Sequence, residues 1–298
     1  MLRLALALLL GLSGVAHAQY NVPSQVTGSS VEIARGDAGV AKAPPARGWE
    51  LGTSLDFVTR DGGALGGGLK FTDLVLLRAH GLVVLGERTE LFGGVDLLPK
   101  QPSTTDELLW QSALVGLRQT WSKSLSGYAR AQGGPAVARD GYWVMGEAAA
   151  QARVTLAEKV LYWESTLGGT YTQLFPDRGS KALWQTEALA QTGVAVRDDR
   201  GVFAAWLNFG FHFPVVARPR PSAPDPATDR ALDPQTRVDV SLGMRIGVNR
   251  GLDLFIEAAI LDRGERDQPR TTLPILAGGT DQRRLLFGFN RRFGARRR

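Results

Sequence analysis

The sequence predicts an all-β protein, a transmembrane antiparallel β-barrel of about twelve strands that follows a cleaved signal peptide and a short disordered linker. Apolar and polar residues alternate with period two from Trp49 onward. Most alternating runs are about ten residues or longer, the length that a tilted strand needs to cross a bilayer, whereas strands of soluble proteins are usually nearer five or six residues. The N-terminus has the form of an export signal.

The export signal is predicted to cover residues 1–18. Arg3 supplies a positive charge, residues 4–12 are almost entirely apolar, and Ala16-His17-Ala18 has the small-x-small form that signal peptidase cleaves. A membrane anchor is the alternative, but an apolar stretch of roughly 13 residues is shorter than the ~20 residues that a spanning helix needs. We therefore expect the mature chain to begin near Gln19, and we expect it to reside in the bacterial outer membrane.

The segment 19–47 is predicted to be a flexible linker, because it contains Ser, Gly, Ala and Pro without an apolar period and closes on Pro44-Pro45. The net charge of +6 comes largely from five arginines close to the C-terminus. A basic tail at 294–298 can bind nucleic acid, but an exported chain rarely meets any, so we expect a solvated periplasmic end and no nucleic-acid partner. The chain has no cysteine, which excludes disulfides, cysteine-ligated metals and lipoprotein attachment.

The clearest alternation lies in residues 237–248. There Val238, Val240 and Leu242 begin an apolar face that continues to residue 248, and polar or small residues occupy the other face. A short turn at 249–251 leads to a second run of the same kind, so the two runs predict a β-hairpin. Counted in this way, the barrel region 48–293 contains strands at 48–60, 70–85, 88–99, 108–121, 127–136, 142–156, 161–175, 183–196, 202–213, 236–248, 252–262 and 281–293.

The predicted connections differ in length between the two ends of the barrel. One set consists of brief turns, whereas the other set includes the Pro-rich segment 214–235 and the segment 263–280. Short periplasmic turns and longer outer loops are typical of bacterial outer-membrane barrels. Trp49, Trp121, Trp163 and Trp184 lie near strand ends on the apolar face, where they could form interfacial girdles.

With these features, the sequence resembles bacterial porin-like outer-membrane β-barrel proteins. The resemblance rests on the signal that ends in Ala16-His17-Ala18, the alternating strands and the last run, 285–293, which ends in the aromatic Phe293. It implies outer-membrane lipid and the barrel-assembly machinery as partners, because that machinery recognises such a last strand. Five residues follow Phe293 here, so the aromatic residue is not terminal as it usually is in this class.

The polar face is predicted to be the inner face of the barrel and the place where function resides. The lumen-facing candidates are Asp56, Glu90, Asp96, Arg118, Glu147, Arg153, Glu164, Glu187, Asp239, Arg245 and Glu257. Charges in the middle of strands need partners or water. They therefore predict either a lumen that passes or binds small solutes, or a closed ion-pair network in a structural or surface-interaction barrel, and the strand count fits both. A secreted β-sandwich that packs its apolar faces inward is the alternative fold.

Enzymatic interpretations have little support in the sequence. Only His80 and His212 remain after signal cleavage, and no Ser lies beside His212 in its strand, although outer-membrane phospholipases use a Ser with a His on a barrel of this size. We therefore predict no catalytic residues, no metal site and no cofactor, and a barrel-embedded hydrolase is the least favoured alternative.

Overall fold

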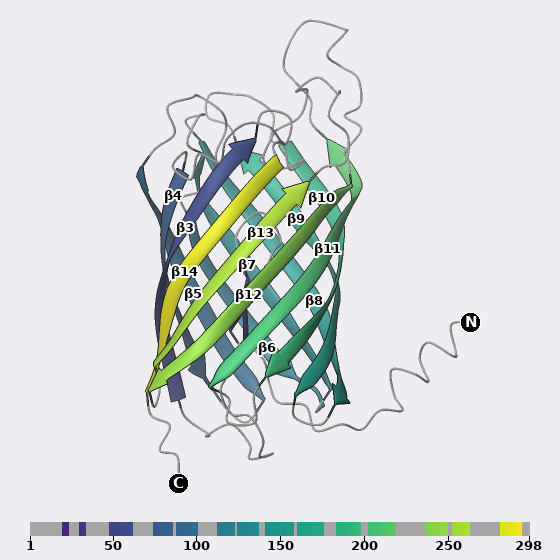
Figure 1. Cartoon of the computed structure of the whole chain (residues 1–298). Helices are drawn as coiled ribbons and strands as arrows, with labels where there is room; N and C mark the ends of the chain where they lie inside the picture. Colours follow the sequence, from purple (N-terminus) through teal and green to yellow (C-terminus); the bar gives the residue numbers. More distant parts are fainter. Residues whose placement is uncertain are drawn as a thin grey trace, which may run out of the picture.

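The computed structural model contains one closed ring of long strands (Figure 1). The structure describes residues 20–23, 30–33, 48–61, 74–85, 88–100, 112–122, 124–136, 141–157, 160–175, 183–197, 202–218, 236–249, 252–262 and 281–293. The predicted signal peptide, the basic tail, Trp110 and the loop 263–280 lie outside these ranges. Among the described residues, no helix is long and apolar enough to cross a membrane.

Twelve antiparallel strands form the barrel, as the sequence predicted, and each strand pairs with the next along the chain. They are β3 (Gly48–Asp61), β4 (Leu74–Val84), β5 (Thr89–Lys100), β6 (Ser112–Thr120), β7 (Leu125–Ala136), β8 (Gly141–Ala157), β9 (Leu161–Phe175), β10 (Leu183–Arg197), β11 (Phe203–Arg218), β12 (Arg237–Asn249), β13 (Leu252–Asp262) and β14 (Asp281–Phe293). The last strand closes the ring against the first, from the pair Asp281–Asp61 to the pair Phe293–Trp49. The all-β barrel prediction is confirmed.

The predicted end of one strand was wrong, because β11 runs to Arg218 and not to residue 213. Pro214 suggested a loop, since proline cannot donate a ladder hydrogen bond and is confined to edges and bulges. In the structure Pro214 lies opposite Glu187, where the register between β10 and β11 shifts after Thr186. The bulge accommodates the proline, and the strand continues beyond it.

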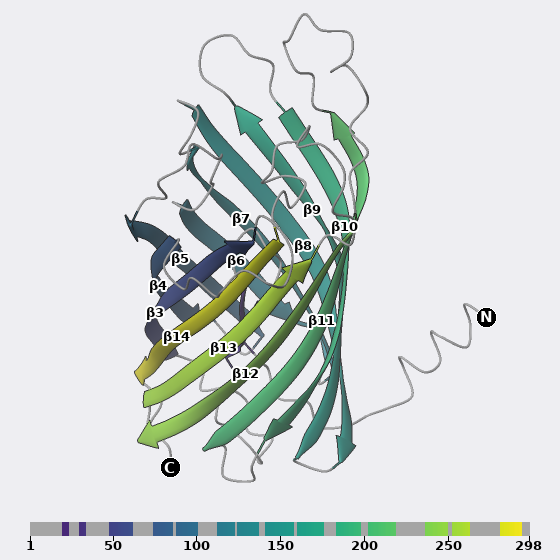
Figure 2. The same cartoon turned by 45° about the horizontal axis from the view of Figure 1, so that its top comes forward.

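The segment 19–47, which the sequence predicted to be a flexible linker, is described by the structure only at residues 20–23 and 30–33. The structure has two short antiparallel strands there, β1 (Tyr20–Pro23) and β2 (Ser30–Ile33). β2 contacts β12, which is labelled in the view of the ring that has its top tilted forward (Figure 2). Four residues per strand are too few for the period-two pattern to stand out in a segment rich in Ser, Gly and Pro.

The outer face of the barrel is apolar and exposed. Leu242, Ile246 and Val248 on β12 are 60%, 48% and 54% exposed, whereas Ser241 and Arg245 on the other face of the same strand are 2% and 0% exposed. Other strands repeat this arrangement, for example with Leu117, Leu167, Leu254 and Phe287 exposed on β6, β9, β13 and β14. A soluble sandwich packs its apolar faces inward, so this inverted polarity is the arrangement of a barrel surrounded by lipid.

Aromatic residues gather at the two ends of the outer face. Trp49 stacks on Phe293 with ring centroids 3.9 Å apart, at the end of the barrel that carries the short turns. Trp121 and Trp163 lie at the same end and are 51% and 43% exposed. At the other end Tyr142 stacks on Phe175 at 4.6 Å, and Trp184 lies 6.1 Å from Tyr171. Two aromatic bands that flank an aliphatic belt match the interfacial girdles of membrane barrels.

Because the outer belt is apolar, a charged substitution there should destabilise the barrel by an amount that depends on its depth in the membrane. Leu242→Arg at the centre of β12 should destabilise the barrel by about 2–4 kcal/mol, because the guanidinium would lie at the midplane of the lipid, whereas Val248→Arg near the strand end should cost only about 0–1 kcal/mol. Denaturant unfolding in lipid vesicles measures both variants. Equal costs at the two positions would contradict a lipid-facing belt.

Candidate functional site: the inner wall of the barrel

The inner wall carries the charged residues that the sequence singled out. Ten of the eleven candidates are buried, and the exception, Glu164, has a side chain that is 19% exposed and pairs with buried Arg153. Each lies on the face opposite the exposed apolar residues of its strand. The structure therefore brings all eleven to one inner surface.

Ion pairs between adjacent strands organise this wall. Every arginine among the buried residues that the structure describes lies beside a carboxylate of a neighbouring strand. The pairs are Arg78–Asp96 at 2.8 Å, Arg118–Glu90 at 3.9 Å, Arg130–Glu147 at 2.6 Å, Arg153–Glu164 and Arg245–Asp253 at 3.2 Å. Cross-strand neighbours are close enough for such pairs, and pairing offsets the cost of removing each charge from water.

A continuous hydrogen-bond chain crosses four strands. On β4, Arg78 Nε donates to Asp96 on β5 at 2.8 Å. Ser112 Oγ on β6 donates to the other oxygen of Asp96 at 2.8 Å, and Gln132 Nε2 on β7 donates to that hydroxyl at 2.8 Å. All four side chains are buried. Such a chain holds its members in fixed rotamers and gives this part of the wall a defined polar surface.

A second cluster lies where the wall is irregular. The two ring nitrogens of His212 on β11, which is 1% exposed, lie 3.7 Å from Glu187 and 3.8 Å from Asp239. The bulge lies on β11 at Val215, next to the Pro214–Glu187 pair, and bulges commonly redirect side chains beside functional sites. Gly210 lies opposite Asp239, and a Cβ there would overlap the Asp239 carboxylate. The glycine thus leaves the space in which Asp239 lies beside His212.

Glycines provide similar space for larger side chains. A Cβ at Gly243 would overlap the indole of Trp206, its partner on β11, and a Cβ at Gly116 would overlap the ring of Phe92 on β5. Each ring therefore lies across the glycine of the next strand, along the wall. Trp206 also donates its Nε1–H to Glu257 at 3.0 Å, which fixes the orientation of the indole.

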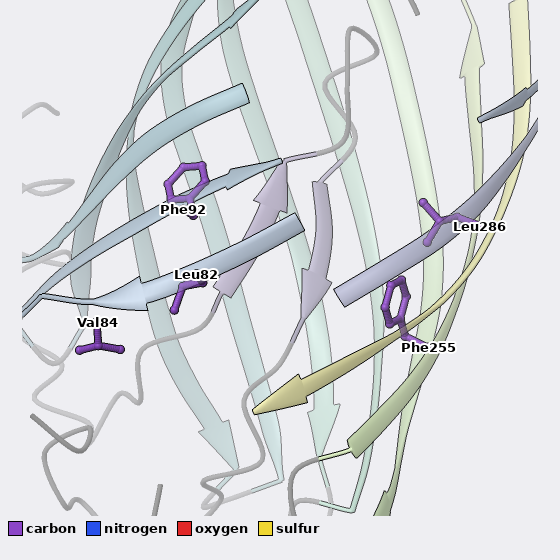
Figure 3. Close-up of a cluster of buried hydrophobic side chains, with 5 residues drawn as sticks. All are labelled: Leu82, Val84, Phe92, Phe255 and Leu286. Atoms are coloured by element: carbon purple, nitrogen blue, oxygen red, sulfur yellow. The ribbon is translucent and has the colours of Figure 1, made fainter. Parts of the chain in front are cut away.

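One part of the inner wall is apolar, which the prediction of a polar, charged interior did not anticipate. Leu82, Val84, Phe92, Phe255 and Leu286 form a buried cluster, 3–8% exposed, which we call the inner apolar cluster (Figure 3). On β4 both sets of alternate residues are largely apolar, so the two faces of this strand could not be told apart by their polarity. The inner wall is therefore polar over most of its area and apolar in one region.

Several inner residues were missed from the sequence for related reasons. Arg78 and His80 lie on β4, where neither face is distinctly polar, and His80 donates to Asn290 across the β3 strand at 2.7 Å. Arg130 and Tyr128 lie on β7, whose outer positions are small residues and gave a weak signal. Both contact Glu147, since Arg130 pairs with it and the Tyr128 hydroxyl donates to it. Pairing of neighbouring strands, which the sequence does not show, would have been needed to find them.

The geometry does not assemble a nucleophile with a base among the described residues. Both ring nitrogens of His212 face carboxylates, and the nearby Ser241 lies opposite Asn208, away from His212 along the strands. His80 is engaged with Asn290. No group of three or more His, Cys, Asp or Glu side chains within the described part of the chain is placed to hold a metal ion.

Comparison with known proteins identifies the architecture. No protein-family model and no curated protein matches the sequence. The solved structure of the NanC porin has a TM-score of 0.50 at 7% identity, over 81% of this chain and 98% of that chain. An outer-membrane channel from Pseudomonas putida F1 has a TM-score of 0.47 at 12% identity, over 88% and 100%. The translocator domain of the autotransporter NalP from Neisseria meningitidis has 0.44 at 11%, over 84% and 89%.

At these identities the likeness concerns the fold alone, and the NanC porin carries it. The chain is therefore a porin-like β-barrel in architecture, as the resemblance in the sequence implied. The fold alone does not identify a solute.

The Arg130–Glu147 pair predicts a stability effect that a second substitution can reverse. Both side chains are 2% exposed, so Arg130→Met leaves a buried, uncompensated carboxylate and should cost about 3–5 kcal/mol. Arg130→Met/Glu147→Gln removes the charge and retains an acceptor for Tyr128, so it should recover most of the loss. Denaturant unfolding in detergent micelles measures both, and a double variant no more stable than the single one would contradict the pairing.

Proposed function

We propose that this protein is a porin-like channel that passes, or binds and passes, small polar solutes across the bacterial outer membrane. The observation that carries the proposal is the inverted polarity of a closed ring, whose outer face is exposed and apolar and whose inner face holds charged and hydrogen-bonding side chains. A wall of this kind separates lipid from a polar interior.

The proposed location follows from independent features. The signal-like residues 1–18 direct export, the aromatic bands match the two interfaces of a bilayer, and the barrel has the fold of a porin. Outer-membrane lipid would cover the belt. The barrel-assembly machinery would receive β14. The last residue of this strand, Phe293, stacks on Trp49 of β3, the strand against which the ring closes.

The inner wall suggests the kind of solute. Arginines and carboxylates alternate with hydroxyl and amide groups such as Ser112, Gln132, Thr170 and Asn208, so the wall offers both donors and acceptors. A polar solute can exchange hydrogen bonds with water for hydrogen bonds with this wall. In such barrels the lumen side chains set charge preference, and we assign that role to the eleven predicted residues. The protein needs no cofactor for this function.

A closed barrel without transport is the second candidate, and one observation favours it. The inner charged side chains are almost fully buried, with Asp56 and Arg245 both 0% exposed, so the lumen as observed is filled around them. In that case the function would reside in the outer loops, which would meet an external partner.

Two measurements, made one after the other, test the proposal. Mature protein refolded into detergent should migrate faster on a gel before boiling than after it, because a closed barrel remains folded, and it should require detergent to fold. Planar bilayers should then show discrete conductance steps. Cooperative folding in plain buffer would overturn the barrel in lipid, and a folded barrel without conductance would favour the closed alternative.

The His212 cluster predicts a change in ion selectivity. Glu187→Gln/Asp239→Asn removes two inner carboxylates, so the reversal potential in a KCl gradient should shift toward anion preference. Ser241→Ala, an uncharged change on the same strand as Asp239, is the matched control and should leave the reversal potential unaltered. The same potential for all three proteins would show that these carboxylates do not border the conducting path.

A further inference from the structure

Buried polar side chains form a row along the inner wall across the seven neighbouring strands from β14 to β8, and we call this row the polar arc. It consists of Asn290 and His80, the hydrogen-bond chain from Arg78 to Gln132, and Trp143. At its start Asn290 and His80 meet across Gly52 of β3, where a Cβ would overlap both side chains. The glycine thus allows two strands that are not neighbours to share a hydrogen bond.

Strand geometry joins the two ends of the polar arc to the hydrogen-bond chain. His80 and Arg78 occupy successive inner positions of β4, because side chains two residues apart share a face. On β8 the partner of Gln132 is Met145, two residues after Trp143, so Gln132 and Trp143 are diagonal neighbours. Trp143 is 1% exposed, so its indole belongs to the inner face and not to the exposed outer face.

Five side chains of the polar arc each retain a polar atom without a hydrogen-bond partner in the part of the chain that the structure describes. These atoms are Asn290 Nδ2, His80 Nδ1, Arg78 Nη2, Gln132 Oε1 and Trp143 Nε1. The five side chains are 0–7% exposed. A buried polar group without a partner is costly, and native proteins keep few of them. Five such atoms along one row therefore indicate a surface that binds a partner from outside the wall.

The unused atoms alternate in hydrogen-bonding character along the polar arc. His80 Nε2 donates to the Asn290 carbonyl, so Nδ1 of the neutral ring accepts, while the Asn290 amide group can still donate. Farther along, Arg78 Nη2 donates, Gln132 Oε1 accepts and Trp143 Nε1 donates. A hydroxyl group both donates and accepts. Successive hydroxyl groups of one solute therefore match this alternation.

The charge of the polar arc favours a neutral solute. Arg78 is the one permanently charged side chain among the five, and its Nε lies 2.8 Å from an oxygen of Asp96. Because this ion pair offsets the charge of the guanidinium, the unused Nη2 acts as a hydrogen-bond donor and not as a site of net positive charge.

We propose that the polar arc binds neutral polyhydroxylated solutes, such as sugars and sugar alcohols, during their passage through the barrel. This inference rests on the proposed channel function and names its class of solute. Because the five side chains are almost fully covered in the observed structure, a solute reaches them only when the interior opens beside the arc.

Single-channel recording of the mature protein with D-glucose in the bath tests the proposal. Glucose should reduce the potassium chloride current in a saturable manner, because a bound solute obstructs the path. Trp143→Phe retains an aromatic ring without the N–H donor, and it should raise the glucose concentration for half-maximal block about two- to tenfold, the loss expected for one hydrogen bond. Trp163→Phe makes the same change on the outer face, where the indole donates to Thr192, and should leave that concentration unaltered.

Two further solutes test the class. Triethylene glycol dimethyl ether accepts hydrogen bonds but cannot donate them, so it should give no saturable block. Gluconate carries several hydroxyl groups together with a negative charge, and it should block no better than glucose. Stronger block by either solute than by glucose would overturn the assignment to neutral polyhydroxylated solutes.

The outcomes distinguish this inference from the channel function. If the protein conducts ions but glucose gives no saturable block, or blocks Trp143→Phe and the unsubstituted protein equally, water alone satisfies the polar arc. The binding proposal is then overturned while the channel function stands. If the folded barrel does not conduct, the channel function fails, and the binding is decided by a measurement on the protein in detergent.

That measurement is the temperature at which the refolded protein loses its fast-migrating form on a gel. A ligand that binds only the folded protein raises this temperature. Glucose should raise it more for the unsubstituted protein and for Trp163→Phe than for Trp143→Phe. An equal rise in all three would be the general stabilisation that sugars give to folded proteins, and it would overturn the polar arc as a binding site.

Discussion

The hydrogen bonds between β14 and β3 are the interaction on which the rest of the structure depends. Lipid offers no hydrogen bonds, so a sheet with a free edge is not viable in a bilayer, and every strand must have a partner on each side. The antiparallel pairing from Asp281–Asp61 to Phe293–Trp49 removes the last two edges of the twelve-stranded sheet. The aromatic stack of Trp49 on Phe293 lies at one end of that seam and adds apolar contact where the ring closes.

Closure also fixes which residues face inward, since a slip of one residue in any strand would transfer its charged side chains to the lipid face. The cross-strand ion pairs depend on this register: Arg130 meets Glu147, and Arg118 meets Glu90, as direct partners across their strand pairs. The pairs stabilise the interior only in the observed register, because any other leaves buried charges without their partners. The polar wall therefore favours the correct pairing of the strands.

The outcome of prediction from sequence depended on the contrast between the two faces of each strand. β12 and β13 have strictly alternating residues, and their bounds and inward charges followed directly. β4 is largely apolar on both faces and β7 has small residues on its outer face, so Arg78 and Arg130 could not be placed on the inner wall. The His212 cluster could not be predicted for a different reason. It depends on a bulge and a glycine, both on β11, whose effects become apparent only when the neighbouring strands are aligned. The hairpin β1–β2 did not stand out in the sequence because four residues per strand are too few to show a period-two pattern.

The glycines of the inner wall have a consequence for how such a protein can change over evolution. A Cβ at Gly243 would overlap the indole of Trp206, and a Cβ at Gly116 would overlap the ring of Phe92, so neither glycine can be replaced unless the ring moves. A substitution at either position therefore changes the arrangement of a large side chain on the neighbouring strand. Because of this dependence, we expect the partners Gly243 and Trp206, and likewise Gly116 and Phe92, to vary together among related sequences.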